Sequence, residues 1–233
     1  MFAFHAGLLP RHSTTLAVTS INPTTLPIWS VDANTQHATK LAPADAAFDA
    51  YSLASIAEIA SLLTQLHRCR LPITLVSAIL SMAGLYSEDD AIDTRKTVSG
   101  CAPMDLAYLR YDIPPPPRHP LLQVDTTTLV LECVSHDQGW CAFAHELNLT
   151  YASSSSWVEF EVLAADGRVL VARRPVCVNL RASSTYRRHR LDVADELVPG
   201  SQVVMHLRAD DPEWANHACY ARIALRRSWR LHS

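Results

Sequence analysis

The sequence predicts a mainly β protein, an antiparallel jelly-roll-like β-sandwich that follows a small α-helical segment. Apolar residues recur every three or four positions between Leu53 and Ala83, as in amphipathic helices, and at alternate positions from Trp157 onward, as in half-buried strands. Between these two patterns stand four prolines at 114–117, which form a stiff extended spacer. We therefore expect three parts, which are a tail over 1–42, a helical segment over 43–109 and a β-sandwich over 110–233.

The N-terminal half contains a tail and two expected helices. Residues 1–42 carry three prolines and Ser/Thr clusters without periodicity, so we expect a disordered or loosely packed tail. A first helix is expected after Pro43, with apolar residues at helical spacing as far as Leu66. A second is expected to open at Leu71-Pro72, because proline is tolerated in a first helical turn. Residues 87–104 are polar and acidic, and we expect a loop there.

The C-terminal half is predicted to form short strands separated by turns. Val158, Phe160 and Val162 alternate with polar or amphipathic neighbours, and Asp166-Gly167 is a strong hairpin turn. Pro199-Gly200 turns the chain into another apolar run at 203–207. About seven such strands are typical of an antiparallel sandwich or jelly roll.

Composition excludes several classes of function. A hydrophobic content of 48%, a net charge of −3 and a pI near 6.4 indicate a globular protein, with neither nucleic acid nor a membrane as its partner. No apolar run approaches the ~20 residues that a membrane span needs. The six cysteines form no C-x-x-C pair, so their spacing supports no zinc site. We expect reduced cysteines in an intracellular protein, cytoplasmic or nuclear, without metal or cofactor.

Two loops carry the strongest functional signal. The runs at 129–134 and 203–207 each lead into an acid- and amide-bearing loop with one tryptophan, and the loops of a sandwich cluster at its ends. Such tryptophans either stack on a sugar face or plug an open end of the sandwich, and we favour the plug. The candidate ligand-binding residues are His136, Asp137, Gln138, Trp140, Asp210, Trp214 and Asn216.

Ser135-His136-Asp137 contains the residue types of a hydrolase triad. A triad requires the base to lie between the nucleophile and the acid, whereas consecutive residues of a strand point in divergent directions. The sequence also lacks a G-x-S-x-G elbow. We therefore expect local hydrogen bonds rather than catalysis from these three residues.

Several of these motifs resemble a known family. The Ser-His-Asp-Gln-Gly-Trp segment at 135–140, the strand that begins Ser156-Trp157, and the pattern from Pro199-Gly200 to Trp214 look like a group of fungal proteins. They resemble the F-box-associated sandwich, a galactose-binding-like fold. The segment that opens Leu71-Pro72-Ile73-Thr74-Leu75 is similar to the beginning of an F-box. The chain departs from the fungal pattern at Val158 and Glu159, and residues 87–101 show no apolar period for further F-box helices.

The resemblance implies a non-catalytic binding module. Its sandwich is expected to recognise a glycan or a protein, and its Leu-Pro helix to dock a ubiquitin-ligase adaptor through Leu71, Pro72, Leu75 and Ile79. The alternatives are a hydrolase that uses Ser135, His136 and Asp137, and a structural scaffold without a ligand. Because no further F-box helices would support an exposed face, we expect Leu75 and Ile79 to be buried.

Overall fold

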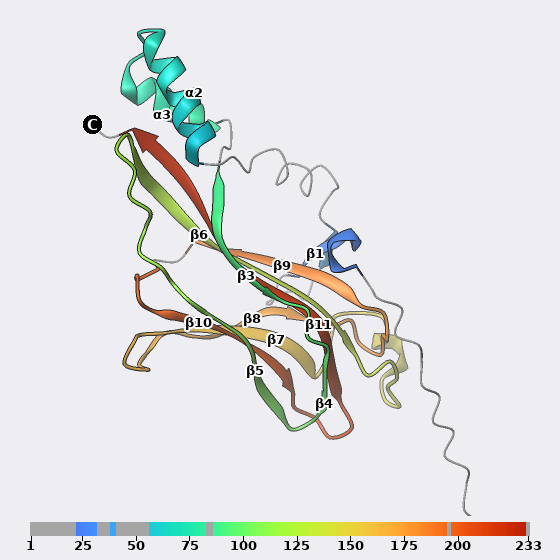
Figure 1. Cartoon of the computed structure of the whole chain (residues 1–233). Coiled ribbons are helices and arrows are strands. Elements are labelled where there is room, and N and C mark those ends of the chain that lie inside the picture. Colours follow the sequence, from blue (N-terminus) through green and yellow to red (C-terminus); the bar gives the residue numbers. More distant parts are fainter. Residues whose placement is uncertain (1–21, 32–37, 41–55, 83–85, 195–196, 232–233) are drawn as a thin grey trace, which may run out of the picture.

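The computed structural model describes residues 22–31, 38–40, 56–82, 86–194 and 197–231 (Figure 1). In this described part of the chain, two α-helices precede most of the strands. In chain order the elements are η1 (Pro23–Thr25), β1 (Ile28–Val31), β2 (Ala38–Lys40), α2 (Ile56–Arg68), α3 (Ile73–Met82), β3 (Ser87–Thr94), β4 (Val98–Cys101), β5 (Met104–Asp112), β6 (Leu122–Asp137), η2 (His145–Leu147), β7 (Ser156–Leu163), β8 (Val169–Val178), β9 (Arg187–Val193), β10 (Gln202–Ala209) and β11 (Ala215–Leu231).

The strands form two sheets that face each other. One has the order β2-β1-β9-β6-β11-β3, with β4 also paired to β11, and the other has the order β5-β10-β7-β8. If β3 and β5 to β11 are numbered 1 to 8 along the chain, the strand order β3-β11-β6-β9 in the larger sheet reads 1-8-3-6. The order β5-β10-β7-β8 in the smaller sheet reads 2-7-4-5. This is the jelly-roll order, so the predicted β-sandwich is confirmed.

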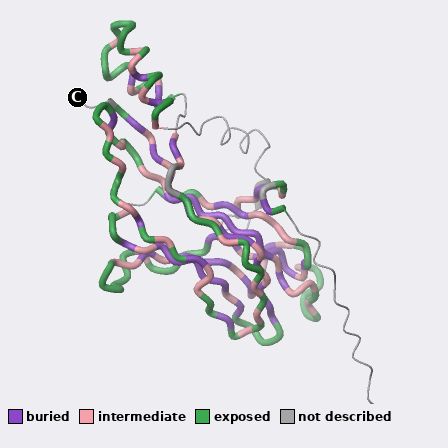
Figure 2. The backbone as a smooth tube through the Cα atoms, viewed as in Figure 1, coloured by how far each residue is buried: buried purple, intermediate pink, exposed green. Residues whose placement is uncertain are grey.

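The core lies between the two sheets. Alternate residues of β6 and β11, such as Leu131 and Ile223, point inward from the larger sheet, and Phe160 and Met205 meet them from the smaller one. All four are essentially inaccessible to solvent. Figure 2 shows the buried backbone following the centres of these strands, with exposed positions at the turns and on the helices.

The helices form a second, smaller cluster. Ile59 and Leu63 of α2 and Val76 and Leu80 of α3 pack against Leu122 and Trp229. These last two residues lie at the start of β6 and near the end of β11, so the helix pair sits on one end of the sandwich (Figure 1). The two predicted helices are confirmed where the structure describes them, and no helix there is long and apolar enough to cross a membrane.

The proline run does not separate two cores. The expected loop at 87–104 contains β3, β4 and the start of β5, which pair with β11 and β10 of the sandwich. The expected boundary at residue 110 is therefore wrong, because the prolines only connect β5 in one sheet to β6 in the other. The polar sequence of β3 lacks the alternating apolar residues by which a strand is predicted from sequence. β3 lies at a sheet edge, where backbone pairing holds a strand without an apolar face.

Part of the expected N-terminal tail is also ordered. Ile28–Val31 forms β1, which pairs in parallel with β9 and antiparallel with β2. Ile28 is buried, and the Arg187 guanidinium lies 4.6 Å from the centre of the Trp29 ring, as in a cation–π contact. The remainder of the expected tail, 1–21, 32–37 and 41–42, lies outside the described residues.

Candidate functional site

The two predicted loops do meet at one end of the sandwich. β6 and β11 are neighbours, with Asp137 opposite Asn216 and His136 opposite His217. Beyond the paired residues, Gln138 Oε1 accepts a hydrogen bond of 3.2 Å from the backbone N–H of Ala215. We call this end, formed by residues 135–155, 179–186 and 210–217, the rim.

Asp137 and Asn216 are buried and their polar atoms are occupied. The Asp137 carboxylate accepts hydrogen bonds from Ser156 Oγ (2.9 Å) and from the backbone N–H of Ala182 (2.8 Å). Asn216 Nδ2 donates to the carbonyls of Trp157 (2.7 Å) and Arg208 (2.9 Å). Burial raises the pKa of Asp137, and these hydrogen bonds oppose that rise. Both side chains therefore hold the rim together and do not face a ligand.

Asn179, which is not among the predicted site residues, lies at the centre of this buried network. Its Oδ1 accepts a hydrogen bond from Ser135 Oγ (2.7 Å), and its Nδ2 lies 3.0 Å from both Ser156 Oγ and Asn216 Oδ1. These partners come from β6, β7 and β11, so one amide joins the two sheets beneath the rim. A single asparagine after an apolar run carries no sequence signal for this role.

The two rim tryptophans have opposite environments. Trp214 is 8% exposed, and the Arg181 guanidinium lies 5.2 Å from the centre of its ring. Trp140 is 54% exposed. The plug interpretation is therefore right for Trp214 and wrong for Trp140. Gly139, with a φ of 93° that favours glycine, separates Trp140 from the end of β6 and redirects the chain there.

Trp140 belongs to a loop that displays other large apolar side chains. In the segment between β6 and β7, Phe143 is 77% exposed and Leu149 is 67% exposed. The Asp137 and Asn216 side chains are instead buried in the hydrogen-bond network, and Asp210 is exposed. The accessible surface of this loop is consequently more apolar than the predicted polar set suggested.

Arg181 holds the loop in place. Its guanidinium donates to the carbonyls of Ser153 (2.5 Å) and Phe143 (2.7 Å), and it lies 2.9 Å from Cys141 Sγ. Its backbone pairs with Leu149 and Thr150 through two further hydrogen bonds. Arg181 is itself buried, so a charged group lies beneath the displayed side chains and satisfies carbonyls that no strand pairs.

The rim also concentrates unusual backbone conformations. Five residues other than glycine have a positive φ in these loops. The left-handed region costs such residues on the order of 1–2 kcal/mol each and is retained where the surrounding contacts enforce it. These residues are Ala144, Leu149, Ser153, Ala182 and Glu213.

His136 and His217 form a stacked pair at the rim. Their ring centres lie 4.5 Å apart at an interplanar angle of 14°, and Tyr186 meets His136 edge-on. Ser99 Oγ lies 2.5 Å from His217 Nδ1. Burial lowers the pKa of both histidines, and the neighbouring His136 lowers that of His217 further. The pair is therefore stable in its neutral form.

The hydrolase alternative finds no support in the geometry. Ser135 donates to Asn179, and Asp137 is bonded to Ser156 and Ala182. His136 lies on the opposite face of β6, against Tyr186 and His217. The three side chains do not meet, so they cannot relay a proton as a triad does.

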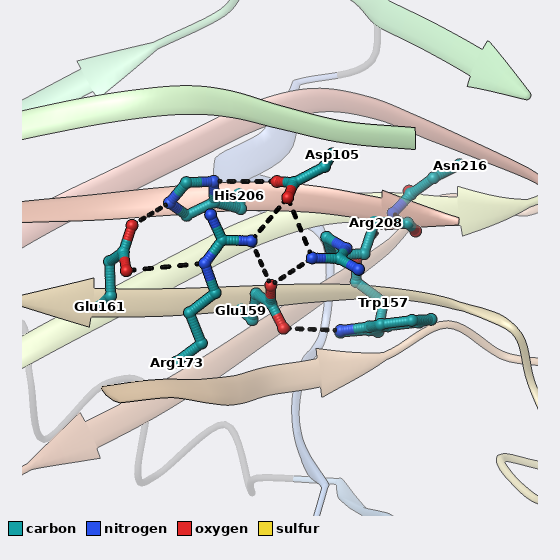
Figure 3. A network of polar contacts seen from close by, with 8 residues as sticks. All are labelled: Asp105, Trp157, Glu159, Glu161, Arg173, His206, Arg208 and Asn216. Atoms are coloured by element: carbon teal, nitrogen blue, oxygen red, sulfur yellow. Dashed lines mark hydrogen bonds and ion pairs between the residues drawn. The ribbon is translucent and has the colours of Figure 1, made fainter. Parts of the chain in front are cut away.

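A second polar cluster covers the outer face of the smaller sheet (Figure 3). Arg173 of β8 contacts Asp105, Glu159 and Glu161 at 2.8–3.5 Å, and Arg208 of β10 contacts Asp105 and Glu159 at 3.1 Å. His206 lies between Glu161 and Asp105, with N···O distances of 2.9 and 3.3 Å. The cluster thus connects all four strands of the sheet.

The ion pairs of this cluster hold neighbouring strands of the smaller sheet together. Burial tends to raise the pKa of Asp105, but the hydrogen bond from Arg173 and the charges of Arg208, Arg173 and His206 lower it overall. Trp157 Nε1 donates to Glu159 (3.0 Å), and Arg208 lies over the Trp157 ring. Each charged group of the cluster has an opposite charge beside it, so we do not assign it to a ligand.

Two of the four adaptor-docking candidates are exposed, and Leu71 packs against the helix cluster. Leu75 is 44% exposed and Pro72 is exposed, whereas Leu71 and Ile79 are partly buried. The expectation that Leu75 would be buried is wrong, because Val76 and Leu80 supply the face of α3 that packs on α2 and β11. Leu75, Ile79 and the 77% exposed Met82 follow one another at helical spacing along the outer side of α3.

Comparisons with known proteins give no family. No protein-family model matches the chain, and no curated protein matches it. The VP2 subviral particle of infectious bursal disease virus is similar over 63% of this chain and 39% of that one, with 8% identity and a TM-score of 0.32. An arabinose-bound α-L-arabinofuranosidase is similar over 60% of this chain and 23% of that one, with 12% identity and a TM-score of 0.27. The chain spans less than half of either, and likenesses at these TM-scores carry no argument about function.

Proposed function

We propose that the chain is a non-catalytic protein-binding module whose rim contacts the partner through Trp140, Phe143 and Leu149. The observation that carries this proposal is the exposure of three large apolar side chains on a loop that a buried arginine, Arg181, holds in place. Exposed apolar groups on a fixed scaffold are typical of interaction sites, and aromatic residues dominate the binding energy of interfaces.

The polar groups of the rim favour a protein over a glycan. Sugar hydroxyls need free carboxylates or amides beside the stacking ring. Here Asp137 and Asn216 are buried in hydrogen bonds with the protein itself, and the Gln138 amide is bonded to the backbone of Ala215 and Trp140. The exposed charges nearby are acidic, so we expect a partner that offers an apolar pocket with basic residues around it. These acids are Glu146, Asp210, Asp211 and Glu213.

The helix pair would provide a second contact, which the resemblance to an F-box assigns to a ubiquitin-ligase adaptor. The exposed side chains of Leu75 and Met82 on α3, with the partly buried Ile79 between them, support this part of the proposal. α3 packs near the start of β6, whereas the rim begins at the other end of this 16-residue strand. At about 3.3 Å per residue the two surfaces are roughly 50 Å apart. One chain could therefore hold an adaptor and a second protein without a clash.

The rim is tested by the double variant Trp140→Ala/Phe143→Ala. Partners of the full chain are captured by proximity labelling, and those enriched are then purified and titrated directly. We expect the variant to bind such a partner at least about 30-fold more weakly, since an aromatic anchor contributes 2 kcal/mol or more. Leu106→Ala/Val169→Ala, which removes two exposed apolar side chains from the smaller sheet, is the matched control. Equal binding by both variants would rule out the rim.

A glycan microarray tests the alternative that the rim binds a carbohydrate. Specific glycan binding that disappears in Trp140→Ala would replace the protein partner by a carbohydrate. Binding to neither class by the intact chain would leave the scaffold interpretation.

The second surface is tested separately with a purified ligase adaptor. We expect binding by the intact chain, loss with Leu75→Asp, and retention with Thr74→Asp, which places the same charge on an exposed position of the same helix. Failure of the intact chain to bind would remove the ligase part of the proposal and leave the rim unaffected.

A further inference from the structure

Three potential metal ligands meet in the core between the sheets. Cys133 of β6 and His189 of β9 are directly opposite each other in the strand register, and Cys177 of β8 approaches from the other sheet. The two sulfur atoms are 3.3 Å apart, and one ligand atom from each of the three residues lies within 4.8 Å of the others. All three side chains are at most 2% exposed.

His189 carries the observation that points to a ligand. Its Nδ1 is buried and has no hydrogen-bond partner among the described residues, whereas its Nε2 lies 3.4 Å from the Tyr151 hydroxyl. Tyr151 in turn accepts a hydrogen bond from Arg187 (3.3 Å). When Nε2 carries the ring proton and donates it to Tyr151, the lone pair of Nδ1 remains available. Metal-binding histidines are commonly oriented in this way by a partner on the second nitrogen.

We propose that Cys133, Cys177 and His189 bind one thiophilic metal ion, with Zn²⁺ as the expected occupant. Two thiolates and a neutral imidazole form a donor set that such ions prefer. The two thiolate charges cancel that of Zn²⁺, so the complex is neutral, as burial in an apolar core requires. The ion would connect the two sheets and satisfy the free histidine nitrogen at the same time.

The sulfur separation fits a metal better than a disulfide. Two thiolates at about 2.3 Å from a zinc ion are roughly 3.8–4.0 Å apart for ligand angles between tetrahedral and trigonal, about 0.5–0.7 Å from the observed spacing. A disulfide would require the sulfurs to approach to about 2.05 Å, a larger movement between two packed sheets. Because the site is closed to solvent, the ion would be bound as the chain folds.

The test is the metal content and the folding of the full chain. The protein is purified from zinc-supplemented cells, and bound metal is measured by elemental analysis, with one Zn²⁺ per chain as the expected result. The chain is also unfolded, stripped with a chelator and refolded with Co²⁺. We expect a thiolate-to-cobalt charge-transfer band and a higher melting temperature than for the metal-free refolded chain.

Two variants locate the site. Cys133→Ala/Cys177→Ala should lose both the zinc and the cobalt band, whereas Cys69→Ser/Cys101→Ser, which alters two exposed cysteines, should keep them. His189→Gln should weaken zinc retention and change the cobalt spectrum. Absence of zinc and of the cobalt band in the refolded wild-type chain would overturn the proposal without any variant. Loss of metal only in Cys69→Ser/Cys101→Ser would show adventitious surface binding and overturn it as well.

Discussion

Replacement of Asn179 by alanine removes the amide that joins the two sheets beneath the rim. This side chain takes part in four hydrogen bonds, accepting from Ser135 and donating toward His136, Ser156 and Asn216 at 2.7–3.3 Å. Asn179 is fully buried, so water cannot replace these partners without opening the fold. The change should therefore reduce the free energy of unfolding strongly.

The expected loss follows from the groups that are left unsatisfied. Ser135 Oγ loses its acceptor and Asn216 Oδ1 loses its donor, and both residues are buried. A buried polar group without a partner costs about 1–3 kcal/mol, which gives about 2–6 kcal/mol for the two. A change near 4 kcal/mol would lower the melting temperature by roughly 8–16 °C in a chain of this size.

Urea unfolding followed by circular dichroism measures this loss. Gln202→Ala is the matched control, because Gln202 also uses its amide in side-chain hydrogen bonds, with Asp112 and Arg110, but at the surface. We expect that control to cost less than about 0.5 kcal/mol. A loss for Asn179→Ala that is no greater than for Gln202→Ala would refute the view that the buried network supports the rim.

Three further outcomes are expected. Trp214→Ala should cost about 3–5 kcal/mol in a thermal melt, and Trp140→Ala about 1 kcal/mol, because only Trp214 is buried; equal losses would show that both indoles are structural. Burial lowers the pKa of His136 and His217 in the folded state, so below about pH 6.5 the unfolded chain binds more protons than the folded one. The free energy of unfolding should therefore fall as the pH decreases, by at most about 1.4 kcal/mol per pH unit for each histidine. His136→Gln/His217→Gln should flatten this dependence, and an unchanged slope in urea titrations between pH 5 and 7 would assign it to other groups. The fragment 110–233 lacks β3, β4 and most of β5, so its melt should not be cooperative, and a sharp transition would restore the proline run as a domain boundary.

The periodicity of the sequence was sufficient for the fold class because burial on one face is a local pattern. Alternating residues around Phe160 and helical spacing from Ile59 to Leu80 each mark the side of an element that becomes buried. β3 has no such pattern, because it is an edge strand with a polar sequence, held by pairing with β11. Pairing depends on a partner more than 120 residues away in the chain, which no local pattern reports.

The candidate site shows the same division. The neighbourhood of the two rim loops could be predicted, since strand ends carry loops that cluster. Which side chains face outward could not. Asp137, Asn216 and Trp214 are buried by the opposite sheet and by Arg181, and Trp140 is not. Two tryptophans in similar loops thus have opposite environments, and tertiary contacts decide which of them is buried.

The sequence by itself determined the jelly-roll class, the two helices and the meeting of the rim loops, because each depends on residues close together in the chain or on general rules of strand connection. Only the tertiary structure decided the roles of Asn179 and Arg181 and the meeting of Cys133, Cys177 and His189. These residues come from different strands and loops, and their spacing along the chain follows no motif. Their chemistry depends on burial and on partners, and both arise only when the two sheets pack together.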